Sequence, residues 1–170
     1  ADTGIRVLVT ARDEKKGREA IKSIDGKGRR FEFCALDVND EQSIRATIAH
    51  VENAFGRLDG LINNAGVAID GGADGLKVGI DIVRKTIETN AFGPLLLSQA
   101  AVPLMKKNGY GRIVNLSSGL GSLTEMGAGH LAYRISKVAL NAITCVLAAE
   151  LKGTNILVNT MCPGWVRTDM

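Results

Sequence analysis

Short apolar runs alternate along the chain with longer stretches in which apolar residues recur at helical spacing. The runs predict buried strands, and they are Ile5–Thr10, Phe31–Leu36, Leu58–Asn63, Arg112–Leu116 and Ile156–Thr160. The stretches predict helices at Glu14–Ile24, from Asn39-Asp40 to Gly56, in the region from Ile80 to Lys107, and at Ala132–Leu151. Strands that alternate with helices imply parallel βαβ units, so the fold class we predict is a doubly wound α/β domain over residues 1–170.

Composition narrows the functional classes. The chain is 45% hydrophobic and 23% charged, with a net charge of +3, and no uninterrupted apolar stretch approaches the roughly 18 residues of a membrane helix. Basic residues cluster between Arg12 and Arg30, but acidic residues are interspersed and no aromatic platform accompanies them, so we favour a solvated helix face beside an anionic ligand over a nucleic-acid surface. Scattered cysteines without metal-ligand spacing predict no metal site and favour the cytoplasm.

Arg12 follows the first predicted strand in the segment Thr10-Ala11-Arg12. In a dinucleotide-binding fold, a carboxylate near this point binds the ribose 2′-hydroxyl of NAD, whereas an arginine suits the 2′-phosphate of NADP. The sequence therefore favours NADPH over NAD. Asp13 complicates this interpretation, because it is either the cap of the following helix or a repulsive neighbour of the phosphate.

Two further strand ends carry candidate cofactor contacts. Asp37-Val38 follows the second strand, where a polar and a small apolar side chain could hold an adenine ring. Asn63-Asn64-Ala65-Gly66 follows the third strand, and its small residues Ala65 and Gly66 allow a ligand to approach the backbone. The asparagines can tie neighbouring strand ends together. Each segment taken alone is equally compatible with an ordinary turn.

Tyr133 and Lys137 are four residues apart at the start of a predicted helix, so they share one face. A nearby ammonium favours the phenolate and is expected to lower the pKa of the tyrosine toward neutral pH. Strand-end hydroxyls precede them at Ser117 and Ser118, and either could bind a substrate carbonyl oxygen. Both patterns also occur by chance in proteins without this chemistry.

Asn90 lies in a helix-forming region four residues before Pro94. Proline has no N–H group, so the helical carbonyl four residues earlier loses its partner. The sequence therefore predicts a kink and a free carbonyl at Asn90 that could hold a water molecule. A kink without catalytic meaning is the alternative.

The ordered set of these segments resembles the classical short-chain dehydrogenases/reductases, and Pro163-Gly164-Trp165-Val166-Arg167-Thr168 extends the match almost to the end of the chain. The resemblance implies a three-layer Rossmann-like domain with Tyr133 as general acid/base, Ser118 as carbonyl ligand, Lys137 on the nicotinamide ribose and Asn90 on a relay water. Pro163, Gly164, Trp165, Val166 and Thr168 would line the nicotinamide and pyrophosphate side. The Thr-Ala-Arg and Cys-Pro-Gly-Trp segments are similar to those of NADPH-dependent carbonyl reductases. This similarity implies a small carbonyl or alcohol substrate, and a homo-oligomer is a possible state of assembly.

One departure from the family is large. The glycine-rich phosphate turn and the strand before it are absent from the sequence, and so is the family's C-terminal segment. The missing strand is central in the order 3-2-1-4-5-6, so two interior strands should have unpaired edges. We therefore expect the 170-residue chain alone not to form a stable monomer. A nucleotide-sensing protein without turnover and an inactive fragment are the alternative functional interpretations.

Overall fold

A computed structural model describes residues 4–24 and 31–164. The elements run in the order β1 Val7–Ala11, α1 Glu14–Ile24, β2 Phe31–Ala35, α2 Glu41–Phe55, β3 Gly60–Asn63, α3 Ile80–Ile87, a π-helical turn Glu88–Phe92, α4 Gly93–Lys107, β4 Gly111–Leu116, a 3₁₀ turn Gly119–Gly121, α5 Leu131–Glu150 and β5 Ile156–Met161. Every strand and helix predicted from the apolar pattern is present, with ends that differ by one or two residues, except in the region from Ile80 to Lys107.

That region is not one helix. The π-helical turn separates α3 from α4, and the Gly93 N–H donates to the carbonyl of Glu88, five residues earlier. Pro94 has no N–H to donate to the Asn90 carbonyl, and the wider turn lies where this helical bond is missing. The kink predicted at Asn90 is therefore confirmed, and it takes the form of a wider turn.

Capping residues fix the starts of α1 and α2. The Asp13 carboxylate accepts from the backbone N–H of Lys16 at 3.0 Å, and the Asp40 carboxylate accepts from that of Gln42 at 2.9 Å. Gly56 closes α2 in the left-handed conformation, with φ of 70°. Asp13 is thus the helix cap, which is the first of its two predicted interpretations.

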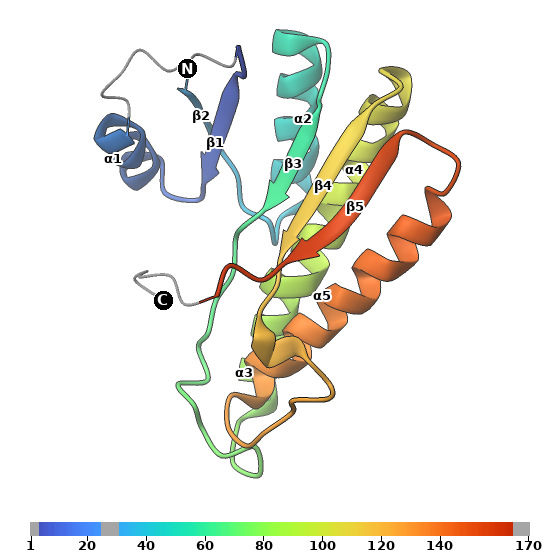
Figure 1. The fold of residues 1–170 in the computed structure, drawn as a ribbon. Coiled ribbons are helices and arrows are strands. Elements are labelled where there is room, and N and C mark those ends of the chain that lie inside the picture. The colour runs from blue at the N-terminus through green and yellow to red at the C-terminus, as the bar shows by residue number, and fades with distance from the viewer. Residues whose placement is uncertain (1–3, 25–30, 165–170) are drawn as a thin grey trace.

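All strand pairs are parallel, and the described strands form two separate sheets, β1-β2 and β3-β4-β5. Figure 1 shows the β1-β2 unit with α1 standing apart from the larger sheet. Among the described strands, β1 pairs only with β2 and β3 only with β4. The expected interruption in the sheet is present, and it leaves one backbone edge of β1 and one of β3 without a strand partner in the described residues.

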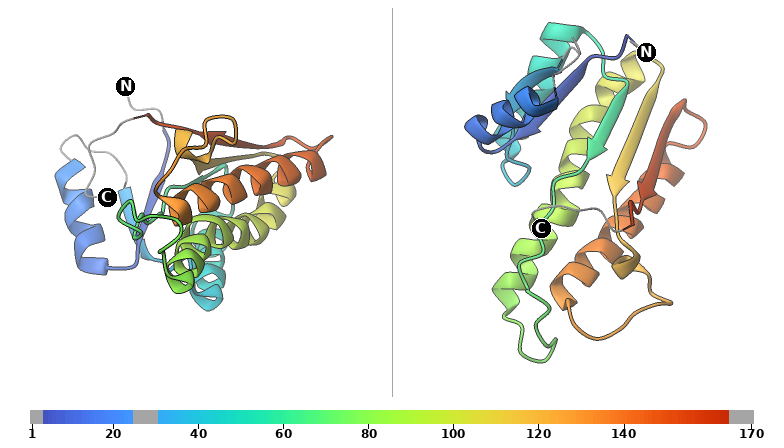
Figure 2. Two further views of the ribbon diagram at one scale, coloured as in Figure 1. Left: turned by 90° about the horizontal axis from the view of Figure 1, so that it is seen from below. Right: turned by 60° about the vertical axis from the view of Figure 1, so that its left-hand side comes forward.

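Helices α1 and α2 lie on opposite faces of β1-β2, whereas the helices that pack on the larger sheet lie on one of its faces (Figure 2). Phe33 of β2 packs under Gly17 of α1, while Cys34, the next residue, points the other way and places its sulfur 3.8 Å from the Thr47 hydroxyl of α2. Helices α2, α4 and α5 lie together on one side of β3-β4-β5 (Figure 2). The architecture is therefore the predicted α/β class.

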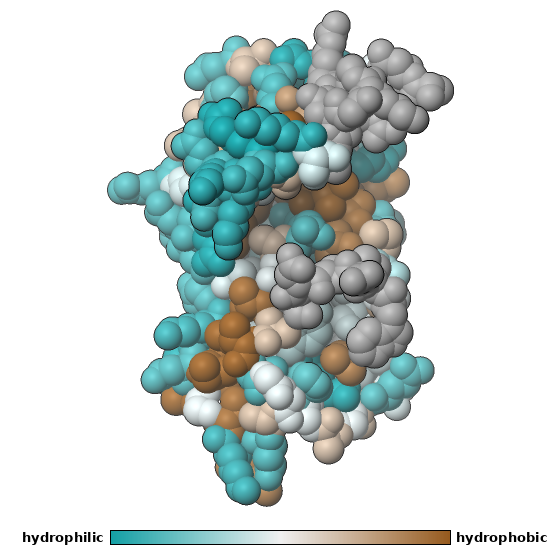
Figure 3. Space-filling model, turned by 90° about the vertical axis from the view of Figure 1, so that its left-hand side faces the viewer, coloured by the Kyte–Doolittle hydropathy of each residue, from teal (hydrophilic) through white to brown (hydrophobic). Residues whose placement is uncertain are grey.

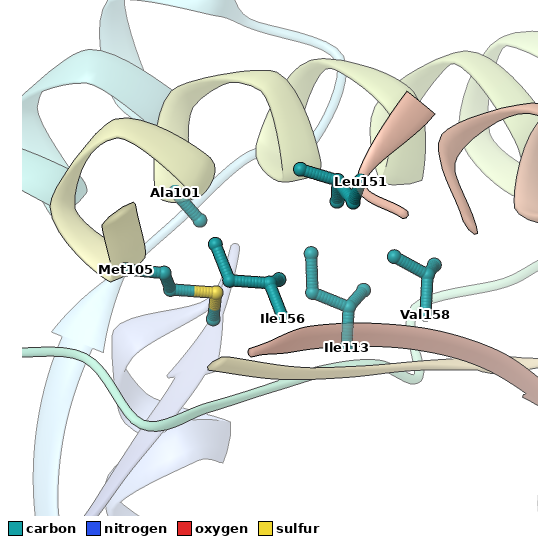
Figure 4. Packing of buried hydrophobic residues seen from close by; sticks show 6 residues of the cluster. All are labelled: Ala101, Met105, Ile113, Leu151, Ile156 and Val158. Carbon is teal, nitrogen blue, oxygen red and sulfur yellow. The ribbon is translucent and has the colours of Figure 1, made fainter. Parts of the chain in front are cut away.

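The main core lies between the larger sheet and α4 and α5. Figure 4 shows the cluster that fills it, which consists of Ala101, Met105, Ile113, Leu151, Ile156 and Val158. A second cluster, of Leu36, Val38, Ile44 and Leu97, joins α2 and α4 to the end of β2. Burial of these apolar groups is the dominant force that holds the helices on the sheet.

Replacement of Met105 by alanine tests this core. Met105 is fully buried, so Met105→Ala should lower the free energy of unfolding by about 2–5 kcal/mol through lost burial and a residual cavity. Urea unfolding followed by circular dichroism measures the change. Leu76, which is 95% exposed, provides the control, and Leu76→Ala should change the free energy of unfolding by less than about 0.5 kcal/mol. Equal effects of the two substitutions would contradict this location of the core.

The opposite face of the larger sheet is not covered among the described residues. Ile62 is 68% exposed, and Leu157 and Met161 are each 49% exposed. Figure 3 views the molecule from the side of α1, β1 and β2 and shows a hollow with apolar surface inside it. Exposed apolar area of this kind favours association or further covering structure. The expectation that the 170-residue chain is unstable alone stays a prediction.

Helix α5 is long and apolar enough to cross a membrane by length and composition, and it is the one described helix that meets this test. Helices from the cores of soluble proteins meet it as well. In this fold α5 packs along β5 and α3, and it buries the polar residues Ser136, Lys137 and Thr144. These contacts hold α5 against the rest of the fold, and 28% of its most apolar 18-residue window is buried.

Candidate active site

The candidate residues converge because parallel strands end at the same edge of a sheet. The arrowheads of β3, β4 and β5 point toward one end of the molecule, where α5 begins and the loop after β3 passes (Figure 1). Segment 63–66 follows β3, Ser117-Ser118 follow β4, and Tyr133 lies in the first turn of α5. Ligands of open α/β sheets bind at this carboxyl edge.

Tyr133 and Ser118 lie together at this edge. Their side chains are close enough to interact, and this interaction lowers the pKa of Tyr133, which favours the phenolate form. Ser117 points elsewhere: it is 8% exposed, and its hydroxyl donates to the amide oxygen of Asn141 at 2.7 Å. The Ser118 hydroxyl accepts from the Leu120 N–H at 3.2 Å and lies near Tyr133, so Ser118 stays our prediction for the substrate-binding serine.

The expected effect of Lys137 on Tyr133 is wrong for this structure. The pKa of Tyr133 is raised from its ordinary value, chiefly because burial disfavours the phenolate and also because the Cys162 thiol is near, while the Ser118 hydrogen bond opposes the rise. The Lys137 ammonium is 5.4 Å from the centroid of the Tyr133 ring, and it donates to the Leu116 carbonyl at 2.7 Å. It is thus directed at a backbone oxygen, and the tyrosine does not gain the expected stabilisation of its phenolate.

Burial also changes Lys137 itself. Removal of the ammonium from water lowers the pKa of Lys137 to about 8. The side chain is still mostly protonated at pH 7. It lies close to the loop after β3, since a Cβ atom placed on Gly66 would be 3.7 Å from the Lys137 Nζ.

Asn90 joins three parts of the site through its side chain, which is completely buried. Its amide oxygen accepts from the Val67 N–H at 2.8 Å, and its amide nitrogen donates to the Val67 carbonyl at 2.9 Å and to the Ser136 hydroxyl at 2.9 Å. The sequence pointed to the backbone carbonyl of Asn90 and missed this side-chain role. The water that we expect on that carbonyl stays a prediction.

Asn63 ties strand ends together, as expected. Its amide nitrogen donates to Asn115 Oδ1 on the neighbouring strand β4 at 2.7 Å, and Asn115 donates in turn to the Thr144 hydroxyl of α5 at 2.8 Å. The Asn63 Oδ1 atom is buried and has no hydrogen-bond partner among the described residues. This polar chain fixes the base of the site to α5.

The residues expected at the adenosine end lie around the ends of β1 and β2. Arg12 is exposed, and no ion pair engages it within the described part of the chain. The Asp37 carboxylate accepts from the Asn39 N–H at 2.9 Å. The Val38 side chain is buried in the core, and a Cβ on Gly93 would lie 3.0 Å from it, so a ligand would meet the Val38 backbone instead of its side chain.

A pocket of about 420 Å³ opens beside Arg12. Three cations and one carboxylate contribute to its wall, so its surface is net positive. The lining residues are Arg12, Asn39, Val67, Ile69, Arg84, Lys85, Glu88 and Thr89. Such a surface suits an anionic group.

The C-terminal candidates are only partly described. Pro163 and Gly164 follow β5 and are exposed, whereas Trp165, Val166, Arg167 and Thr168 lie outside the described residues. Within the ranges 4–24 and 31–164, no three His, Cys, Asp or Glu side chains gather where they could hold a metal ion.

The family model described as short chain dehydrogenase matches residues 1–170. The chain belongs to the short-chain dehydrogenase family. It is 32% identical to the (+)-neomenthol dehydrogenase of Arabidopsis thaliana, over 100% of this chain and 77% of the plant protein. Among solved structures, the NADPH-bound carbonyl reductase from chicken fatty liver aligns with a TM-score of 0.88 at 32% identity, over 97% of this chain and 70% of the chicken chain. NAD⁺-bound xylitol dehydrogenase aligns with a TM-score of 0.87 at 28% identity, over 95% of this chain and 61% of the other.

This short-chain dehydrogenase also uses residues that the sequence did not single out. Asn141 holds Ser117, and Ser136 joins Asn90 to the Tyr133 carbonyl, to which its hydroxyl donates at 2.7 Å. Asp70 contacts the first turn of α5, where its carboxylate accepts from the Tyr133 N–H at 3.2 Å. Ser136 lies one helical turn from Tyr133, which is the only local signal. The other contacts join distant segments.

Proposed function

We propose that this short-chain dehydrogenase is an NADPH-dependent oxidoreductase that interconverts a small carbonyl compound and its alcohol. The observation that carries the proposal is the approach of the Tyr133 and Ser118 side chains at the carboxyl edge of the sheet, with the Lys137 ammonium 5.4 Å from the centroid of the tyrosine ring. A carbonyl oxygen placed between two hydroxyls would receive two hydrogen bonds as negative charge develops on it.

The residues present fit a nicotinamide dinucleotide. Arg12 is unpaired within the described chain, Gly66 lets a ligand approach the backbone between Asn90 and Lys137, and the buried Asn63 Oδ1 lacks a partner among the described residues. Arg12, Asp37 and segment 63–66 would hold the adenosine half, while Tyr133, Lys137 and Pro163-Gly164 would border the nicotinamide half. When bound, the nicotinamide supplies or accepts the hydride.

The protonation states favour carbonyl reduction. Because the pKa of Tyr133 is raised, its phenol is protonated at neutral pH and ready to donate a proton to the substrate oxygen. Ser118 would orient the same oxygen. Lys137, with a pKa of about 8, would keep its charge at pH 7 and bind hydroxyl groups of the ribose.

NADPH is preferred in this proposal for electrostatic reasons. Arg12, Arg84 and Lys85 line the pocket at the proposed ribose end; Glu88 is the acidic residue of the lining, and Arg84 is also paired with Asp81 at 3.1 Å. A guanidinium binds phosphate through paired hydrogen bonds. The chicken carbonyl reductase binds NADPH and the xylitol dehydrogenase binds NAD⁺, so either cofactor occurs among similar structures. The positive charge around this pocket supports NADPH for this protein.

Substitution of Arg12 tests the cofactor. Arg12→Ala should lower kcat/KM for NADPH by about 10–100-fold, because hydrogen bonds between charged groups contribute roughly 1.5–3 kcal/mol, and should leave kcat/KM for NADH nearly unchanged. Steady-state rates with each cofactor give the ratio. Arg45→Ala is the control, since Arg45 pairs with Glu41 on the surface of α2. An NADPH/NADH ratio that Arg12→Ala leaves intact would exclude Arg12 from phosphate recognition.

The activity itself is tested with a panel of aldehydes and ketones, with NADPH oxidation followed at saturating cofactor. Turnover of any compound in the panel, if it is lost when Tyr133 is replaced, would support the proposal that the protein is an enzyme. NADPH binding without turnover across the panel would favour a nucleotide-sensing protein.

The cytoplasm stays the proposed location, and the free thiols of Cys34, Cys145 and Cys162 agree with a reducing compartment.

A further inference from the structure

The start of α5 lacks a cap of its own. His130 precedes the first residue of the helix, adopts the left-handed conformation with φ of 54°, and makes no side-chain capping bond. A helix normally has the N–H of its second or third residue satisfied by the side chain at this position. Tyr133 is the third residue of α5, so the N–H that needs the cap belongs to the proposed catalytic residue.

Asp70 supplies this cap from the loop after β3, 63 positions earlier in the sequence. Its Oδ2 atom accepts from the Tyr133 N–H at 3.2 Å, and its side chain has no exposed surface. Its Oδ1 atom lies 3.6 Å from His130 Nδ1 and has no hydrogen-bond partner among the residues that the structure describes. A buried carboxylate is costly unless it is compensated, and the partial positive charge of the helix N-terminus compensates it here.

The loop is shaped to bring Asp70 to this position. The Ala73 N–H donates to the Asp70 carbonyl at 2.8 Å, and the two residues between them, Gly71 and Gly72, have φ of 55° and 76°. Two central residues with positive φ form a tight turn that glycine adopts without strain. A Cβ on Gly72 would lie 3.4 Å from the His130 ring, so the turn packs directly on the residue before α5.

The backbone of Tyr133 is therefore held from both sides. Asp70 accepts from its N–H, and the Ser136 hydroxyl donates to its carbonyl while receiving a hydrogen bond from Asn90. Asn90 also holds Val67, three residues before Asp70 in the same loop. One loop thus joins the Asn63–Gly66 segment, proposed to bind the cofactor, to the first turn of α5.

We propose that Asp70 is a positioning residue for catalysis, which places the Tyr133 phenol by capping the first turn of α5 and links that turn to the cofactor loop. The proposal rests on the proposed function. Loss of the cap would let the turn shift, and displacements of about 1 Å at a catalytic group can cost 10²-fold in rate. We place Asp70 in contact with neither substrate nor cofactor, so its removal should act on kcat more than on cofactor binding.

The test compares two substitutions of nearly equal size in the full-length protein. Asp70→Leu removes the acceptor, and it should lower kcat by about 10–100-fold while the KM for NADPH changes by less than about 3-fold. Asp70→Asn keeps an oxygen acceptor for the Tyr133 N–H, and it should restore kcat to within about 5-fold of the parent. Amide hydrogen exchange should be faster at Tyr133 in Asp70→Leu than in Asp70→Asn.

Asp74 provides the matched control, because it is an exposed carboxylate of the same loop that bonds only the nearby Leu76 N–H, at 3.0 Å. Asp74→Leu should leave kcat within about 2-fold of the parent. A parent-like kcat in Asp70→Leu, or equal losses in kcat and in NADPH affinity, would overturn the proposal. Failure of Asp70→Leu to fold while Asp70→Asn folds would reduce Asp70 to a structural role and overturn it as well. Absence of turnover in the parent protein would instead refute the proposed function.

Discussion

Tyr133→Phe should lower kcat for carbonyl reduction by about 10²–10⁴-fold, which is the range of a lost general acid. The substitution removes the phenol oxygen, which is the proposed proton donor. The aromatic ring is retained, and so is its contact with the Lys137 ammonium, 5.4 Å from the ring centroid. Ser118 keeps its place after β4, and its hydroxyl still accepts from the Leu120 N–H at 3.2 Å. Stopped-flow single turnover at saturating NADPH measures the chemical step without the contribution of product release.

Cofactor affinity separates this result from general damage. The dissociation constant for NADPH, measured by fluorescence titration, should change by less than about 3-fold in Tyr133→Phe, because the phenol oxygen contributes little of the total contact with a dinucleotide. Tyr110→Phe is the matched control. Tyr110 precedes β4 and stacks on the Arg112 guanidinium at 4.2 Å, away from the carboxyl edge of the sheet, and its substitution should leave kcat unchanged. A Tyr133→Phe protein with parent-like turnover would remove Tyr133 from the mechanism.

Ser118→Ala should lower kcat by about 10²–10³-fold, the loss that follows removal of one hydrogen-bond donor to a developing oxyanion. The structure provides an internal comparison, because Ser117 is adjacent in sequence but its hydroxyl donates to Asn141 at 2.7 Å. Ser117→Ala should therefore leave kcat within about 3-fold of the parent. Its cost should instead be in stability, about 1 kcal/mol of unfolding free energy for one hydrogen bond.

The comparison of Ser117→Ala with Ser118→Ala is decisive, because the two substitutions are expected to affect different properties of the protein. Steady-state kinetics on both variants, with urea unfolding on each, gives a kcat loss in one and a stability loss in the other. If Ser117→Ala loses turnover and Ser118→Ala retains it, the assignment of the substrate-binding hydroxyl is reversed. Equal small effects in both would leave Tyr133 as the sole proton-handling group of the site.

The elements of the fold were determined by the sequence itself. Burial of one face imposes a period on apolar residues, and this period depends only on local geometry, so the strands and helices could be predicted from spacing. The caps Asp13, Asp40 and Gly56 and the break before Pro94 are local as well, because each acts on a backbone group within a few residues. The approximate place of the site followed from the same information, since polar residues at the carboxyl ends of parallel strands must meet at one edge.

Tertiary structure alone decided the finer chemistry of the site. Ser117 and Ser118 are the same residue type in adjacent positions. Only the position of Asn141, which lies on α5, shows that the Ser117 hydroxyl is the one that donates to it. The pKa of Tyr133 depends on burial and on its neighbours Ser118 and Cys162, and the spacing of four residues, which brings Tyr133 and Lys137 together, does not fix these. Asp70 reaches the Tyr133 N–H across 63 positions of sequence. These contacts form between segments that are distant along the chain, so no local pattern encodes them, and their energies depend on solvent exclusion that exists only once the segments have packed.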